Sequence, residues 1–186
     1  VNIGILGKYT SIRDAYASID KAIEHASTNL SAKVNIKWID VTDLETGTAD
    51  PKLEAADLDG VIVPGGFGER GIEGKLAAVK WSREHGIPFL GICLGFQMAV
   101  IEFARNVVGL EDANSTEFDI KCKNPVIAEL PEQKEIEGLG GTMRLGGQDV
   151  AITPGSFAEQ LFGCTNVRER FRHRYEVEPT YIDQLT

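Results

Sequence analysis

Short apolar runs alternate with helical segments through the first 109 residues, and this alternation constrains the fold more than any other feature of the sequence. Four runs are almost continuously apolar and rich in β-branched residues: residues 1–7, 34–39, 59–64 and 87–93. Segments between or after them repeat apolar side chains at helical spacing, over residues 13–26, 71–86 and 94–109. Strands without a polar face suit a parallel sheet that is covered on both sides. The sequence therefore predicts an α/β fold with a central, mostly parallel sheet.

The remainder of the chain, from about Leu110, has a different texture. Polar and glycine-dense stretches lead to VRERFRHRYEVEP at residues 167–179, whose alternating pattern predicts strands with one charged face. We expect this part to add mixed or antiparallel strands. The length of 186 residues, without a repeat or low-complexity linker, predicts one domain spanning residues 1–186.

Charge and cysteine content exclude several classes of protein. Asp and Glu number 28 against 19 Lys and Arg, and the net charge of -9 argues against a general nucleic-acid or membrane-surface binder. No apolar run reaches the roughly 20 residues that cross a bilayer, and the N-terminus lacks the features of a signal peptide. Cys93, Cys122 and Cys164 have neither a disulfide pattern nor metal-like spacing, so we expect no metal site and a cytoplasmic protein.

Cys93 occupies the most informative position in the sequence. It lies where the apolar run PFLGIC meets the helical run LGFQMAV, with Gly91 and Gly95 two residues away on either side. A strand that turns directly into a helix is typical of a nucleophile elbow, where glycines admit a tight backbone. We expect the helix N-terminus to lower the thiol pKa and the N–H of Leu94 to face an oxyanion. The alternative from this motif alone is an ordinary buried cysteine.

A second glycine cluster, VPGGFG at residues 63–68, follows the preceding apolar run. The carboxyl ends of parallel strands face one crevice, so this loop is predicted to lie beside Cys93. Gly65 and Gly66 would let the backbone approach a substrate, with the N–H of Gly66 as a second oxyanion donor. A plain turn is the alternative. The spacing and the absence of the Lys-Ser/Thr ending argue against a P-loop.

Six segments taken together resemble the class I glutamine amidotransferase domains of the CTP synthase family. They are GKYTSIRDAYASI (7–19), PGGFGERGIEGK (64–75), GICLGFQ (91–97), ANSTEFD (113–119), GGTMRLG (140–146) and RFRHRYEVEP (170–179). The resemblance covers nearly the whole chain. It implies a three-layer, flavodoxin-like sandwich.

The resemblance also implies roles for individual residues. Cys93 would attack the side-chain carboxamide of glutamine, form a glutamyl thioester and release ammonia, after which water frees glutamate. The resemblance assigns the oxyanion hole to Gly66 and Leu94 and the lining of the glutamine pocket to Gly95, Phe96 and Gln97. It implies that Glu117 binds the α-amino group of glutamine and that Arg174 binds the α-carboxylate, in keeping with the charges of these side chains. Phe96 departs from the family, where many relatives carry Met.

The acid–base partners of the family are missing from these 186 residues. In the family the cysteine works with a His and a Glu in a later HPE segment, and no such segment precedes Thr186. We therefore expect the chain to be shortened at its C-terminus. His25 and His85 are predicted to be structural. His173 lies among four arginines, which disfavour a protonated imidazole, so we expect no catalytic role for it.

The family resemblance further implies partners that this chain does not contain. The whole enzyme has an N-terminal synthetase domain that uses ATP and Mg²⁺ to activate UTP, receives the ammonia, responds to GTP and forms a homotetramer. Three function classes remain open at this point: a glutamine amidohydrolase domain, another cysteine hydrolase of the same architecture, and a glutamine-binding or regulatory domain without a complete triad. The residues favour the first.

Overall fold

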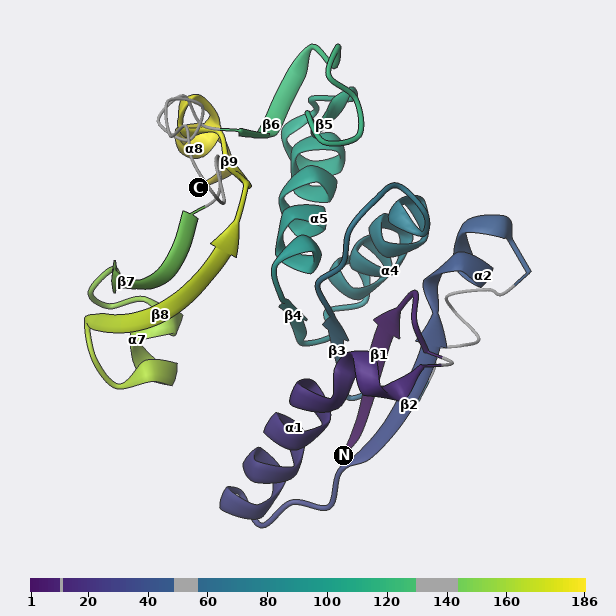
Figure 1. Cartoon of the computed structure of the whole chain (residues 1–186), viewed down its shortest axis with the longest axis vertical. Coiled ribbons are helices and arrows are strands. Elements are labelled where there is room, and N and C mark those ends of the chain that lie inside the picture. Colours follow the sequence, from purple (N-terminus) through teal and green to yellow (C-terminus); the bar gives the residue numbers. More distant parts are fainter. Residues whose placement is uncertain (11, 49–56, 130–143) are drawn as a thin grey trace.

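A four-stranded parallel sheet organises the N-terminal half of the chain (Figure 1). The structure is a computed structural model that describes residues 1–10, 12–48, 57–129 and 144–186. Its strands are β1 (Asn2–Gly7), β2 (Asn35–Asp40), β3 (Gly60–Val63) and β4 (Phe89–Gly91), in the order β2-β1-β3-β4 with every pair parallel. These are the four apolar runs, so the predicted parallel sheet is confirmed.

Helices connect the strands and cover the sheet. They are α1 (Ala17–Asn29), preceded by a 3₁₀ turn at Arg13–Tyr16, then α2 (Val41–Thr46), α4 (Ile72–Glu84) and α5 (Leu94–Phe103). A π-helical turn, Ala104–Val108, extends α5 and ends at Gly109, whose φ of 87° explains the glycine. The sequence analysis missed α2, although Asp40 caps its first turn through Thr42 N–H and Gly47 ends it with a φ of 73°.

The core lies between the sheet and the helices α2, α4 and α5. From β1 the chain adds β2 on one side of the sheet, and then reverses to add β3 and β4 on the other side. Because the connections are right-handed, α1 lies on the opposite face of the sheet from the other helices. Ile5 and Val63 in the sheet and Met98 and Ile101 in α5 are fully buried, whereas α1 has no buried residue. The same reversal opens a crevice beyond the carboxyl ends of these strands.

The C-terminal part adds two further small sheets, as predicted. A three-stranded sheet joins β5 (Ala113–Ser115), β6 (Asn124–Glu129) and β9 (Tyr175–Val177), and a two-stranded antiparallel sheet joins β7 (Arg144–Ala151) and β8 (Asn166–His173). The remaining elements are α7 (Phe157–Phe162), a 3₁₀ turn at Pro179–Tyr181 and α8 (Ile182–Leu185). Figure 1 shows β8 leading into β9 beside α5, which brings the arginine-rich segment towards the central sheet. The GGTMRLG segment lies mostly outside the described residues.

Candidate active site

Cys93 lies on a sharp corner between β4 and α5, as the sequence predicts. Its φ of 55° and ψ of -111° are unusual for a residue with a side chain. The corner is held to the neighbouring strand by a hydrogen bond from Ile92 N–H to the Val63 carbonyl, at 2.9 Å. The backbone N–H of Leu94 points at the sulfur, and Cys93 remains half-buried.

Close backbone approach accounts for the two glycines that flank the corner. A Cβ on Gly95 would lie 1.9 Å from the Val63 carbonyl oxygen, because α5 begins directly against β3. A Cβ on Gly91 would lie 2.6 Å from the backbone nitrogen of Phe96. Neither position has room for a side chain, so the glycines are a consequence of the tight turn from strand to helix.

The Gly65–Gly66 loop lies beside Cys93, which confirms the predicted meeting of the two glycine motifs. A Cβ on Gly65 would lie 3.3 Å from Cys93 Cβ and 3.7 Å from Sγ. Two lysines that the sequence analysis did not single out lie beneath this loop. Lys75 Nζ donates to the Pro64 carbonyl at 2.8 Å, and Lys8 Nζ donates to the carbonyls of Phe67 and Gly68.

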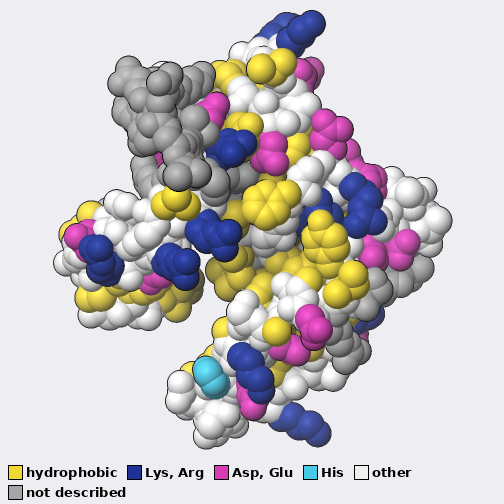
Figure 2. All heavy atoms as spheres, in the orientation of Figure 1, with side chains coloured by type: hydrophobic (Ala, Val, Ile, Leu, Met, Phe, Trp, Pro, Cys, Tyr) yellow, Lys and Arg dark blue, Asp and Glu magenta, His cyan; other side chains and the backbone are white. Residues whose placement is uncertain are grey.

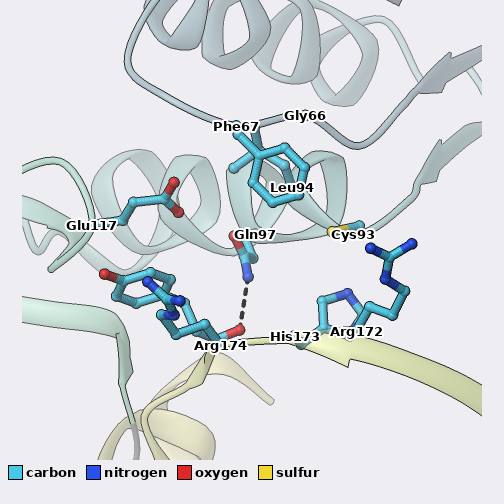
Figure 3. Close-up of a pocket in the computed structure, with 10 residues that line it drawn as sticks. Gly66, Phe67, Cys93, Leu94, Gln97, Glu117, Arg172, His173 and Arg174 are labelled. Carbon is cyan, nitrogen blue, oxygen red and sulfur yellow. Dashed lines mark hydrogen bonds between the residues drawn. The ribbon is translucent and has the colours of Figure 1, made fainter. Parts of the chain in front are cut away.

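A cavity of about 180 Å³ extends from Cys93 along α5 (Figure 3). It is lined by Gly66, Phe67, Cys93, Leu94, Gln97, Glu117, Arg172, His173, Arg174 and Tyr175. Six of these are residues that the sequence analysis assigned to the site. Drug-sized ligands usually occupy 300–1,000 Å³, so this space suits a smaller molecule of amino-acid size.

Glu117 and Arg174 lie at the opposite end of this cavity from the thiol, whereas Arg172 lies on the side of Cys93 (Figure 3). In Figure 3, Glu117 and Arg174 flank one end, while Cys93 lies towards the other beyond Gln97. Glu117 N–H donates to Ser115 Oγ at 3.1 Å, and Ser115 is fully buried, which fixes the loop after β5. The arrangement offers a carboxylate and a guanidinium to one end of a ligand and a nucleophile to the other.

Gln97 connects the helix to the arginine-rich segment. It is 7% exposed and donates from Nε2 to the Tyr175 carbonyl at 2.9 Å, drawn as the dashed line in Figure 3. Leu94 and Gln97 share one face of α5, because residues three apart are neighbours on a helix. Phe96 projects elsewhere, is 52% exposed and lines an adjoining cavity, while Gly95 faces β3.

Burial dominates the proton affinities at the site. It raises the pKa of the Cys93 thiol above its ordinary value, although Leu94 N–H and Lys75 act in the opposite direction. The expectation of a lowered thiol pKa is therefore wrong, because desolvation of the thiolate outweighs the helix N-terminus. Burial also raises the pKa of Glu117, against Gly68 N–H, Lys8 and Arg174.

The three histidines occupy different surroundings. His25 is exposed on α1. His85 caps α4, with Nδ1 2.8 Å from the Trp81 carbonyl oxygen and its ring stacked on Trp81, which agrees with the expected structural role. His173 lines the cavity together with Cys93, and its ring meets Phe171 edge-on. Among the described residues, no hydrogen bond joins the Cys93 sulfur to a histidine.

Two further properties bear on the chemistry available to the described part of the chain. Within those ranges no cluster of His, Cys, Asp and Glu could hold a metal ion. None of the described helices has the length and apolar character needed to cross a bilayer.

Comparison with known proteins decides the family. Residues 11–185 match the family described as glutamine amidotransferase class-I. The chain belongs to this family. It is 37% identical to the solved structure described as "Trypanosoma brucei CTPS - glutaminase domain with bound acivicin", with a TM-score of 0.87 over 100% of this chain and 71% of that one. The predicted fold and the predicted family are thereby confirmed.

The similar curated proteins are CTP synthases. The chain is 56% identical to the CTP synthase of Archaeoglobus fulgidus over 99% of its own length and 34% of that enzyme. It is also 56% identical to the CTP synthase of Methanocaldococcus jannaschii, over 100% of its own length and 35% of that enzyme. This glutamine amidotransferase chain therefore spans about a third of the length of these relatives.

Proposed function

We propose that this glutamine amidotransferase chain binds L-glutamine in the cavity beside Cys93 and that Cys93 cleaves the side-chain amide when the histidine–glutamate pair of the family is supplied, so that these 186 residues alone are inactive or nearly so. The Cys93 thiolate adds to the carboxamide carbon, and the N–H groups of Gly66 and Leu94 stabilise the resulting oxyanion. Collapse of this intermediate, with a proton delivered to nitrogen, expels ammonia and leaves a γ-glutamyl thioester. Water then hydrolyses the thioester to glutamate and restores the thiol.

One observation carries this proposal: a single small cavity joins Cys93 to both Glu117 and Arg174. The carboxylate pairs with the α-ammonium of glutamine and the guanidinium pairs with its α-carboxylate. This orientation directs the side-chain amide along Gln97 towards the sulfur. Each charged group of the substrate then has a partner of opposite charge, so the site would favour an amino acid over a simple amide.

Proton delivery to the leaving ammonia is assigned to the histidine–glutamate pair of the family, which these 186 residues do not contain. Two further cavities border Cys93, of about 450 Å³ and 570 Å³, and we place this pair in the first of them. Gly91, Phe96 and Phe171 line that cavity together with Cys93, so a histidine within it would approach the sulfur from the side away from Glu117. His173 borders this cavity and the one that joins Cys93 to Glu117, and we assign it no part in proton transfer.

In the longer enzyme, we propose that the ammonia aminates UTP to CTP. The reaction would use ATP and Mg²⁺ on a synthetase domain outside these residues, with GTP as activator, in a cytoplasmic homotetramer. The CTP synthase relatives, about three times the length of this chain, support this assignment.

Labelling with acivicin tests the proposal. Acivicin is an amino acid with an electrophilic ring, and the Trypanosoma brucei structure carries it. We expect one adduct per chain, located at Cys93 by peptide mapping, abolished in Cys93→Ser and slowed by L-glutamine. Labelling of Cys122 or Cys164 instead, or labelling that glutamine does not slow, would refute the assignment of the site.

A further inference from the structure

Lys75 is a fully buried lysine beneath the candidate active site. It lies in the first turn of α4 and has an exposed fraction of 0%. At the adjacent Gly74 a Cβ would lie 1.9 Å from the Val41 carbonyl oxygen, so α4 packs closely against α2 at this turn. A lysine in this position is unusual, because a buried ammonium normally has a carboxylate partner.

The Gly65–Gly66 loop lies between Lys75 and Cys93. On one side, Gly65 faces the Cys93 side chain. On the other, Lys75 Nζ holds the Pro64 carbonyl and would lie 3.7 Å from a Cβ placed on Gly66. The ammonium therefore supports the loop from below, at the two residues where the backbone turns towards the thiol.

No carboxylate neutralises this ammonium among the residues that the structure describes, where its one hydrogen bond goes to Pro64. The acidic group that acts on Lys75 is the Cys93 thiol, and the electrostatic attraction between the two favours the thiolate. A negative charge on the sulfur, or on the oxyanion beside Gly66, would supply the counter-charge that the resting site lacks.

We propose that Lys75 is a positioning residue, whose buried charge fixes the Gly65–Gly66 loop and stabilises the anionic form of Cys93. This inference rests on the proposed role of Cys93 as the nucleophile. Lys75 does not line the glutamine cavity, so it acts through the loop and through its electrostatic field.

Other charged groups around Cys93 affect its titration. Glu117 opposes the thiolate, and Lys8 opposes a charge on Lys75. Arg172, His173 and Arg174 line the same cavity from β8 and the residue after it. These groups are unchanged when Lys75 is replaced, so a comparison between variants isolates its contribution.

The test compares Lys75→Met with Lys80→Met, a control on the same helix whose side chain is 48% exposed. The rate of Cys93 modification is followed from pH 6 to 10 with two probes, acivicin and iodoacetamide. We expect Lys75→Met to slow modification of Cys93 about tenfold near pH 7, where Lys75 is charged, and the rates of the two proteins to converge above pH 8, where Lys75 has lost its proton. The acivicin concentration for half-maximal rate should change little. Lys80→Met should match the unmodified protein.

Each result decides between defined alternatives. The inference is overturned if the rate of Cys93 modification depends on pH in the same way in Lys75→Met and in the unmodified protein. It is also overturned if Lys75→Met weakens acivicin binding without slowing modification by iodoacetamide. If Lys75→Met does not fold, the unmodified protein decides: a two-step rise with one step near pH 8 supports coupling to Lys75, and a single step overturns it. If acivicin fails to label Cys93 in the unmodified protein, the proposed function fails, and the iodoacetamide profiles still decide the role of Lys75.

Discussion

Gln97 donates a hydrogen bond to the Tyr175 carbonyl at 2.9 Å and so fastens α5 to the segment that carries Arg174. These residues are 78 positions apart in the sequence. The thiol at the start of α5 and the guanidinium before β9 therefore keep a fixed separation. This separation is what a ligand with a reactive end and a charged end requires.

Replacing Gln97 by Met should weaken glutamine binding more than it slows the chemical step. Methionine keeps the length of the side chain but leaves the Tyr175 carbonyl without its donor, at a cost of about 1–3 kcal/mol. We expect the half-saturating acivicin concentration to rise about tenfold, with a maximal labelling rate within about threefold. Kinetics over a range of acivicin concentrations measure both values. An unchanged half-saturating concentration would show that this hydrogen bond does not contribute to ligand binding.

Two alkylating reagents should choose different cysteines. Cys164 is exposed, whereas Cys93 is half-buried and has a raised pKa, so iodoacetamide in limiting amount should label Cys164 first. Acivicin should label Cys93, because binding of its amino-acid portion brings the electrophile to the sulfur. Peptide mapping after each reagent checks this reversal. Labelling of Cys93 first by both reagents would mean that intrinsic thiol reactivity, and not binding, governs selectivity.

Glutamine affinity should fall in acid as Glu117 takes up a proton. Burial raises the pKa of this carboxyl above 4.5, so the loss should begin at a higher pH than for an exposed glutamate. In Glu117→Gln the affinity should be lower by tenfold or more and independent of pH in this range. Calorimetric titration of Cys93→Ser with L-glutamine between pH 4.5 and 7 measures both effects. A variant that retains the pH dependence would assign it to another group.

Substitution of Gly95 by Ala should destabilise the fold severely. The added Cβ meets the Val63 carbonyl oxygen at 1.9 Å, and both atoms are held by the backbone, so we expect a loss above about 3 kcal/mol. Gly86→Ala is the control, since its φ of 63° is strained but nothing lies within 4 Å of the new Cβ. That change should cost about 1–2 kcal/mol. Urea unfolding of both variants gives the comparison, and equal losses would contradict the packing argument.

The burial of Lys75 should make stability depend on pH in the alkaline range. Its pKa is lowered from 10.5 to about 8, first by desolvation and then by Lys8. Between these values the unfolded chain holds a proton that the folded protein has lost, so stability rises with pH. The gain from pH 8 to 10.5 amounts to about 3 kcal/mol at 1.36 kcal/mol per unit. The difference in unfolding free energy between Lys75→Met and Lys80→Met should show this slope, and parallel curves would contradict the shift.

The sequence predicted the backbone corner at Cys93 and the central sheet because both depend on local patterns. The four strands are apolar runs, three of which stop at glycine or proline, and the glycines around Cys93 mark backbone contacts that no side chain could enter. The family resemblance located Glu117 and Arg174, which the structure brings to the same cavity. Spacing alone could not have joined segments so far apart in the chain.

The buried lysines could not be predicted in the same way. Lys75 follows Gly74 in what looks like an ordinary amphipathic helix, and only the fold shows that it is buried, with Nζ at the Pro64 carbonyl beneath the Gly65–Gly66 loop. Gly74 within a helix was the available signal of close packing. The thiol pKa was predicted in the wrong direction for a similar reason. A motif shows the helix N-terminus, while desolvation depends on everything packed around the sulfur.

A crystal structure of Cys93→Ala with L-glutamine tests the central claim most directly, because it separates binding from proton transfer. The account predicts glutamine in the cavity of about 180 Å³, with its α-ammonium at Glu117, its α-carboxylate at Arg174, and its carboxamide facing residue 93 and the N–H of Gly66. Glutamine bound in the reverse orientation, or outside this cavity, would contradict the account.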